Sequence, residues 1–437
     1  MNVLHIGKSD LLGGASKASY RIHQSIKNNA NLSIKSKMRV IKKISLDEDI
    51  ISKNNPFHNN YYPKFITLIN KIYRYGLRTE NPVIHSTAIL NTGLAKELNH
   101  NKLSKDIDIF HLHWLGDITM SIEEIGSLAK PIVWTLHDQW PFCGAEHYVY
   151  LDKKNNLIDK RYYDNYSKDS RLGFEYGKDI NRITWLRKEK NWKKNIYIVC
   201  PSKWMTKCAK KSSLFRNNPI FTIPNPLDTK SWAPIDQLKA KNYLNISSSK
   251  KIILFGAINI INDARKGAKL LFDALRIFRK ISTQDLQKKI ILLAFGQDLK
   301  DIKLDTDFPI RFTGHISDNK KLNIIYSAAD VFVNPSLQES FGQTGSEAHS
   351  CATPVLAFKN SGLADIVDHL KTGYLAEPFN TFSLAEGIRW ILEDEKRNKN
   401  LGANARLKAL KNWDYAIVSK MYSNLYEKIK LNQENKE

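Results

Sequence analysis

Two glutamates, Glu339 and Glu347, lie eight positions apart in the stretch ESFGQTGSE. The run before it, DVFVNPS, predicts a strand, and the small residues of GQTGSEAHSCA are typical of the tightly packed start of a helix. N–H groups at a helix N-terminus favour a phosphate, and carboxylates nearby accept hydrogen bonds from sugar hydroxyls. The stretch could therefore hold a phosphorylated sugar. On spacing alone, the simpler interpretation is that Glu339 caps the helix and Glu347 is solvated.

A pair of cations lies just before another predicted helix. Arg265 and Lys266 follow FGAINIIND and precede GAKLLFDALRIF. Two cations at the end of a strand could neutralise a diphosphate leaving group. An isolated Arg-Lys pair is more often plain surface charge, so the rest of the chain must decide. If the pair holds the leaving group, no divalent metal is needed there, and we expect none.

Two consecutive glycines, Gly13 and Gly14, lie in the loop KSDLLGGASKAS that we expect after the first strand. A tight turn would explain one glycine. Two in sequence indicate that the backbone approaches a ligand phosphate or sugar closely. The pattern is not the G-x-G-x-x-G fingerprint, so it does not predict a dinucleotide cofactor.

The histidines of two predicted strands, residues 107–114 and 131–138, are candidates for chemistry. His111 and His113 lie on the same side of the strand FHLHW, and His137 and Asp138 end the strand before QW. A His-x-His pair could ligate zinc, but two more ligands at suitable spacing are not visible in the sequence. We therefore predict no metal site, and a buried, hydrogen-bonded role remains the simpler alternative for His111.

These residues need a scaffold, and short apolar runs supply its strands. The predicted strands are residues 1–7, 107–114, 131–138, 196–202, 250–258, 288–296, 310–316, 330–336 and 353–360. Amphipathic segments such as AKLLFDALRIFRKI lie between them. Strands that alternate with helices predict an α/β fold with parallel sheets covered by helices on both faces.

Three prolines interrupt the pattern in residues 221–234, and we place a domain junction there. The prediction is a doubly wound N-terminal domain, residues 1–225, and a doubly wound C-terminal domain, residues 226–437. We expect the last helix to pack back on the N-terminal domain. In such domains the ligand binds at the carboxyl ends of the strands, here in the cleft that the two domains would face.

The composition limits the class of protein. The chain has 437 residues, 42% of them hydrophobic, with 67 Lys and Arg against 44 Asp and Glu. The net charge of +23 predicts polyanionic neighbours such as nucleic acid, anionic lipid or a phosphorylated substrate, although a Lys-rich composition alone could also produce it. The spacing of the four cysteines fits a reducing cytoplasm. No apolar run is long enough to span a membrane, no signal peptide is evident, and only the last residues, KLNQENKE, look disordered.

One basic segment has two interpretations. In ITWLRKEKNWKK, Trp185 and Trp192 are seven residues apart, so both lie on one face of a predicted helix among Lys and Arg residues. The helix could rest on an anionic membrane or hold a lipid diphosphate. Packing of the tryptophans into the core is the favoured interpretation.

Read as a whole, the chain resembles the retaining glycosyltransferases of the two-Rossmann (GT-B) architecture, specifically the family-4 type that builds bacterial polysaccharides. Glu339 and Glu347 match the Glu-x7-Glu motif of that family. The order and spacing of further segments carry the resemblance over nearly the whole length. These are Gly13–Gly14, PSKW at 201–204, IPNPLD at 223–228, RKG at 265–267 and SGLADIVDHLKTGYLA at 361–376.

The resemblance implies roles for individual residues. Glu339 would face the donor sugar, and Glu347 would bind the ribose hydroxyls of the nucleotide. Lys266 and Arg265 would stabilise the diphosphate, and His113 or His137 would contact the donor sugar or position the acceptor. Backbone amides of Phe341, Gly342, Gln343 and Thr344, with the loop of Gly13 and Gly14, would approach the sugar or the pyrophosphate. The DID segment at 106–108 resembles the Asp-x-Asp metal motif of another glycosyltransferase architecture, but it begins a strand and is not taken as a metal site.

The implied function is transfer of a sugar, with retention, from a UDP- or GDP-linked donor to a saccharide or lipid-linked acceptor in cell-surface polysaccharide synthesis. No cofactor is implied beyond the nucleotide sugar as co-substrate. The implied location is the cytoplasm, with peripheral contact to an anionic membrane. A sugar-nucleotide epimerase or a phosphorylase of the same architecture is the alternative. A basic nucleic-acid-binding protein is a further one, but the chain contains no recognisable module for it, so we expect no nucleic-acid partner.

Overall fold

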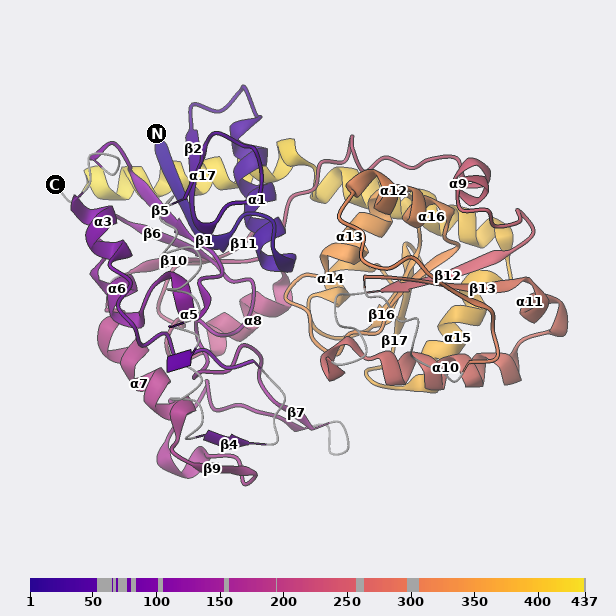
Figure 1. Cartoon of the computed structure of the whole chain (residues 1–437), viewed down its shortest axis with the longest axis horizontal. Helices are drawn as coiled ribbons and strands as arrows, with labels where there is room; N and C mark the ends of the chain where they lie inside the picture. The colour runs from indigo at the N-terminus through magenta and orange to yellow at the C-terminus, as the bar shows by residue number, and fades with distance from the viewer. Residues whose placement is uncertain are drawn as a thin grey trace. The chain divides into compact units, whose positions relative to one another are not determined.

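The structure is a computed structural model of the chain. It describes residues 1–52, 65, 68–69, 77–79, 84–100, 105–152, 157–193, 195–256, 263–296 and 306–435. The chain forms two compact units (Figure 1). Unit 1 consists of Met1–Pro226 together with Val418–Glu437, and unit 2 consists of Leu227–Ile417.

Unit 1 is built on a parallel sheet of seven strands, in the order β11-β10-β6-β5-β1-β2-β3. The strands are β1 (Asn2–Ser9), β2 (Lys35–Lys42), β3 (Ile50–Ile51), β5 (Ile109–Leu112), β6 (Ile132–Thr135), β10 (Ile196–Cys200) and β11 (Ile220–Thr222). The chain adds β2 and β3 on one side of β1 and the later strands on the other. The strand order therefore reverses between β1 and β5, which is where parallel α/β sheets place ligands.

Helices cover both faces of this sheet, and alternate residues of each strand face opposite cores. One core contains Leu4, Phe110 and Trp134; the other contains Val3, Ile109 and Val133. The first core packs on α3 (Leu94–His100), α6 (Ile122–Ser127), α7 (Ile180–Asn191) and α8 (Lys203–Lys211). The second packs on α1 (Gly13–Lys27) and α17 (Tyr415–Glu434). The unit also contains α5 (Gly116–Thr119) and two small antiparallel pairs, β4 (Leu77–Thr79) with β9 (Glu175–Gly177) and β7 (Leu151–Asp152) with β8 (Leu157–Ile158).

Unit 2 repeats this design with a parallel sheet of six strands, in the order β14-β13-β12-β15-β16-β17. The strands are β12 (Lys251–Gly256), β13 (Ile290–Phe295), β14 (Ile310–Phe312), β15 (Val331–Asn334), β16 (Val355–Phe358) and β17 (Gly373–Ala376). Here the order reverses between β12 and β15. The loops that follow these two strands are therefore the expected ligand loops.

The helices of unit 2 also lie on both faces. One core lies under α10 (Ala268–Ile281) and α15 (Thr381–Leu392), and the other lies under α12 (Asn319–Ala328), α13 (Gln343–Ser350), α14 (Leu363–Ile366) and α16 (Glu395–Asn412). Two shorter helices, α9 (Gln237–Tyr243) and α11 (Gln284–Lys289), complete the unit. Two doubly wound α/β units are thus present, as the sequence predicted.

Three local expectations were wrong. The loop expected over residues 8–19 ends early, because α1 already begins at Gly13 and buries Ser16, Ala18 and Ser19. Strand β2 was missed because exposed lysines alternate with its buried residues and hide the apolar pattern. Of the end expected to be disordered, residues 430–434 belong to α17, and residues 436–437 lie outside the described residues.

The basic segment with two tryptophans forms α7 and the residues after it. Trp185 is buried and Trp192 packs against the same core, which confirms the favoured interpretation. Among the helices of the residues that the structure describes, none is long and apolar enough to cross a bilayer.

Candidate functional site

The loops that follow β12 and β15 meet at the point where the strand order of unit 2 reverses. The first carries Arg265 and Lys266 in a short 3-10 turn, Ala264–Lys266, just before α10. The second carries Glu339 just before α13. Residues 257–262, the start of the first loop, lie outside the described residues.

Close backbone packing fixes these two loops together. Gly267 adopts φ +71°, and a Cβ there would lie 1.9 Å from the carbonyl oxygen of Pro335. Leu337 N–H donates to the carbonyl of Arg265 at 2.7 Å. Only glycine allows this approach, so the sequence RKG is needed to place the cations beside the second loop.

Lys266 and Glu339 then meet directly. Lys266 Nζ lies 2.6 Å from Glu339 Oε1, and both side chains remain about one-fifth exposed, at 20% and 18%. Arg265 instead pairs with Asp263, with 2.6 Å between its Nη2 and Oδ2. The ammonium of Lys266 has three donors, so it can hold Glu339 and still bind a phosphate oxygen.

Helix α13 begins beside this pair. Gly342 is its N-cap, with φ +96° and no side-chain cap, and a Cβ there would meet Leu363 Cδ2 at 2.6 Å. Phe341 is buried and meets Trp413 edge to face, while Gln343 and Thr344 are half-buried in the first turn. The N-terminus of α13 thus presents its first backbone N–H groups next to Lys266, which favours an anion.

Glu347 lies in the same helix and is only 7% exposed. Its Oε2 accepts a hydrogen bond from the hydroxyl of Tyr326 at 3.1 Å. The simpler interpretation of the glutamate pair is therefore wrong, because Glu339 does not cap the helix and Glu347 is not solvated. A buried carboxylate with a fixed orientation can select hydroxyl groups of a ligand.

The second loop is held by the segment SGLADIVDHLKTGYLA. Gly362 N–H donates to the carbonyl of Glu339 at 2.8 Å, and the Asn360 amide donates to the carbonyl of Leu337 at 2.7 Å. A Cβ at Gly362 would lie 2.5 Å from the carbonyl oxygen of Ser340. The backbone on both sides of Glu339 is therefore fixed.

In unit 1, the glycine pair also lies where the strand order reverses. Gly13 starts α1 with φ +81°, and a Cβ there would meet no atom within 4 Å. Gly14 is exposed in the first turn. The space in front of Gly13 fits the expectation that a ligand approaches the backbone at this point.

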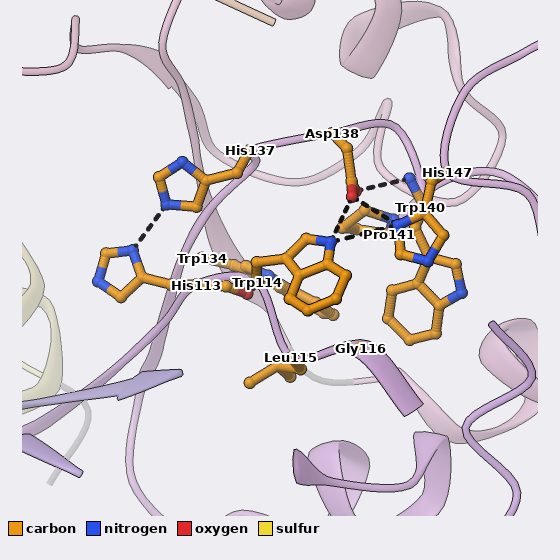
Figure 2. Close-up of a pocket in the computed structure, with 10 residues that line it drawn as sticks. All are labelled: His113, Trp114, Leu115, Gly116, Trp134, His137, Asp138, Trp140, Pro141 and His147. Atoms are coloured by element: carbon orange, nitrogen blue, oxygen red, sulfur yellow. Dashed lines mark hydrogen bonds and ion pairs between the residues drawn. The ribbon is translucent and has the colours of Figure 1, made fainter. Parts of the chain in front are cut away.

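His113 and His137 follow β5 and β6 at the same edge of this sheet, and Figure 2 shows them side by side. His113 Nδ1 lies 3.0 Å from His137 Nε2, and its Nε2 lies 2.9 Å from His5 Nδ1. Burial, partly offset by Asp138, lowers the pKa of His137 to about 4. The sequence analysis missed His5, although a histidine inside the buried run NVLHIG gives the same signal as the histidines of FHLHW.

His111 lies deeper under the same face of the sheet. It is fully buried, its Nδ1 is 2.6 Å from the hydroxyl of Tyr426, and its Nε2 is 2.7 Å from Thr135 Oγ1. Burial is the main cause that lowers the pKa of His5, His111 and His113, and neighbouring histidines lower it further. These imidazoles are neutral at pH 7.

A small pocket opens between the ends of β5 and β6 (Figure 2). Its lining residues are His113, Trp114, Leu115, Gly116, Trp134, His137, Asp138, Trp140, Pro141 and His147. Asp138 Oδ2 holds both Trp114 Nε1 and His147 Nδ1 at 2.6 Å, and His147 Nε2 lies 2.7 Å from Ser86 Oγ. The cavity has a volume of about 10 Å³, room for about one water molecule, so it does not admit a sugar ring in this structure.

A buried cation supports one wall of this pocket. Lys188 of α7 is fully buried, and its ammonium donates to the carbonyls of Trp140, Cys143 and Gly144 at 2.5, 3.0 and 2.6 Å. Burial lowers its pKa to about 7. The sequence analysis did not single out Lys188, because a lysine in a basic helix gives no signal of burial.

Part of the chain, mostly in unit 2, resembles a known family of proteins. Residues 238–408 match the family model described as Glycosyl transferases group 1. The N-acetyl-alpha-D-glucosaminyl L-malate synthase of Bacillus anthracis is 26% identical over 215 residues, which cover 48% of this chain and 54% of that protein. The N,N'-diacetylbacillosaminyl-diphospho-undecaprenol alpha-1,3-N-acetylgalactosaminyltransferase of Campylobacter jejuni is 27% identical over 193 residues, which cover 42% of this chain and 50% of that protein. The chain thus spans about half the length of these relatives.

Solved structures match over nearly the whole chain. Sucrose-phosphate synthase from Thermosynechococcus elongatus aligns with a TM-score of 0.63 at 18% identity and covers 99% of both chains. The Anabaena protein HepE, solved with UDP and glucose, aligns with a TM-score of 0.61 at 14% identity and covers 98% of this chain and 100% of that one. At these identities the likeness shows the fold, and the predicted GT-B architecture is confirmed. Residues 238–408 are thus similar to the Glycosyl transferases group 1 family, and the chain has the two-unit fold of the GT-B glycosyltransferases.

Proposed function

We propose that this chain is a retaining glycosyltransferase that transfers a sugar from a UDP- or GDP-linked donor to a saccharide or lipid-linked acceptor in cell-surface polysaccharide synthesis. The observation that carries the proposal is the contact between Lys266 and Glu339 beside the N-terminus of α13, with Glu347 buried in that helix. This arrangement combines a cation and backbone N–H groups for a diphosphate with two carboxylates for sugar hydroxyls.

In the proposed donor complex, the diphosphate lies at the N-terminus of α13 within reach of Lys266. Glu347, oriented by Tyr326, accepts hydrogen bonds from the ribose hydroxyls, and Glu339 faces the donor sugar. Arg265 contributes positive charge that Asp263 partly offsets. The names of relatives support the class of substrate: HepE was solved with UDP and glucose, and the Campylobacter relative is named for a lipid-diphosphate acceptor.

The reaction we propose is front-face displacement. The acceptor oxygen bonds to the anomeric carbon as the bond from that carbon to the diphosphate oxygen breaks, and the acceptor proton passes to the leaving diphosphate. Lys266 and the N-terminus of α13 stabilise the charge that develops on the diphosphate. No side chain needs to form a covalent intermediate, and no metal takes part in this step.

The acceptor part of the proposal uses unit 1. We assign acceptor or donor-sugar contacts to His137, which is held by His113, and backbone contacts to the loop of Gly13 and Gly14. The setting we propose is the cytoplasm, with peripheral contact to an anionic membrane that the net charge of +23 would favour.

The test is donor binding and turnover with a panel of UDP- and GDP-sugars. Lys266→Ala and Glu347→Ala should each weaken binding of the preferred donor at least about tenfold, the scale of one lost charge-assisted contact of ~1.5–3 kcal/mol. Lys269→Ala is the matched control, because Lys269 is an exposed residue of the same helix start. The proposal fails if no nucleotide sugar binds, or if all three variants bind like the parent. Incubation with donor alone tests for epimerisation, which would favour the alternative.

A further inference from the structure

Three of the buried histidines of unit 1 form a group, of which the proposed function uses only His113, as the residue that holds His137. His5 lies on β1, and His111 lies directly opposite it on the neighbouring strand β5. His113 follows two residues later, so its side chain leaves the sheet on the same face. All three are at most 2% exposed.

The ring nitrogens of this group converge. One nitrogen from each of His5, His111 and His113 lies within 4.8 Å of the other two. Three imidazole nitrogens bound to one tetrahedral zinc at ~2.0–2.1 Å would be roughly 3.4 Å apart. Small side-chain rotations would therefore bring the three nitrogens around one ion.

The surroundings of the three rings match those of metal-ligating histidines. Such a histidine has its second ring nitrogen hydrogen-bonded, which fixes the orientation of the ring. In His113 this second nitrogen is Nδ1, which is hydrogen-bonded to His137. In His111 one nitrogen is hydrogen-bonded to Tyr426 and the other to Thr135, so either hydrogen bond remains when the other nitrogen binds the ion.

An independent observation concerns His5. Its Nε2 is buried and has no hydrogen-bond partner among the residues that the structure describes, while its Nδ1 has only His113 Nε2. A buried nitrogen left without a partner destabilises the folded state. A metal ion bound at Nε2 would give this atom a partner.

We propose that His5, His111 and His113 bind one divalent transition-metal ion that prefers imidazole ligands, such as zinc or cobalt. Three neutral nitrogen ligands and no carboxylate favour such an ion over magnesium or calcium. A water or hydroxide is the expected fourth ligand. The sequence analysis expected no metal because the third ligand, His5, is more than 100 residues away from the His-x-His pair.

The ion would act on the proposed site indirectly. It would join β1 to β5 and orient His113, whose other nitrogen holds His137 at the edge of the pocket. The ion would therefore position His137 in unit 1. Its presence does not depend on whether the proposed reaction takes place at the unit 2 site.

The test is metal binding to the full chain after a chelator has removed bound metal. We expect one Co²⁺ per chain, visible by its absorption, and displacement by one equivalent of Zn²⁺. His5→Asn and His113→Asn each keep an amide near the position of Nδ1 but remove the Nε2 ligand, so each should weaken binding at least about a hundredfold. His23→Asn is the matched control, because His23 lies beside His5, with ring centroids 5.9 Å apart, but is outside the group of three. It should bind like the parent.

Two results would overturn the proposal: a parent chain that takes up neither ion, or ligand variants that bind as tightly as the parent, which would indicate a surface site. If the ligand variants do not fold, the parent alone decides. X-ray absorption of its zinc complex should then show three imidazole ligands at ~2.0–2.1 Å, and fewer than three would refute the assignment.

Discussion

Gly267 and Gly13 provide a matched pair for testing how the cation loop is built. Both start a helix with a similar positive φ, +71° and +81°, but a Cβ would lie 1.9 Å from the Pro335 oxygen at Gly267 and would touch nothing within 4 Å at Gly13. Replacement by alanine costs about 1–2 kcal/mol for the left-handed conformation at either position. Gly267→Ala adds a clash with a backbone atom, which can be relieved only if the loop of Lys266 moves away from β15.

The expected destabilisation is therefore about 1 kcal/mol for Gly13→Ala and more than about 3 kcal/mol for Gly267→Ala. Denaturant unfolding, followed by both fluorescence and circular dichroism, measures the two values and reveals separate transitions if the units unfold separately. Gly267→Ala should also weaken binding of a nucleotide sugar, because Lys266 is displaced from Glu339. Equal destabilisation by the two substitutions would refute the argument that close packing on Pro335 positions the cations.

The remaining predictions concern other buried polar groups. Lys188→Met leaves three carbonyls of the pocket wall without their hydrogen-bond donor. In denaturant titrations it should lower the free energy of unfolding by about 3 kcal/mol. A change below about 1 kcal/mol would show that water replaces the ammonium. Tyr326→Phe should cost about 1 kcal/mol in stability yet weaken nucleotide-sugar binding several-fold by calorimetry, since Glu347 loses its orienting hydrogen bond; unchanged affinity would argue against its role. Burial lowers the pKa of His349 from 6.5 to about 3, so the unfolded chain binds more protons between these values and stability is lost as the pH falls through this window. His349→Leu should remove this loss, so that the stability of the parent relative to the variant falls by about 2 kcal/mol between pH 7 and pH 5, and a constant difference would contradict the assignment.

The sequence predicted the scaffold well where strands are buried on both faces. The runs KKIILFGAI and KKIILLAFG, for example, became the neighbouring central strands β12 and β13. The sequence did not predict strands with one solvent-exposed face, such as β2, whose lysines alternate with buried residues. Short strands at the sheet edges, such as β11 and β17, were missed because three or four residues carry too little pattern.

The candidate site could be predicted only as separate pieces. Lys266 and Glu339 were each singled out for their own surroundings, but their 2.6 Å contact depends on the strand order of the sheet, which no local pattern contains. The same holds for His5, which meets His113 only because β1 and β5 are neighbours. Lys188 illustrates a further limit, since its burial results from three carbonyls that belong to a different segment.

The division of unit 1 between the two ends of the chain affects how the protein can be synthesised. Residues 418–437 complete its core, and Tyr422 and Tyr426 supply hydroxyls to Thr135 and His111 inside it. While a ribosome is still translating unit 2, the face of the nascent N-terminal sheet that carries Val3, Ile109 and Val133 can pack on α1 but still lacks α17. Unit 2 is continuous in the chain, so it can complete its fold before unit 1 does. A premature stop after residue 417 should therefore leave a normal unit 2 attached to a unit 1 that is prone to aggregate.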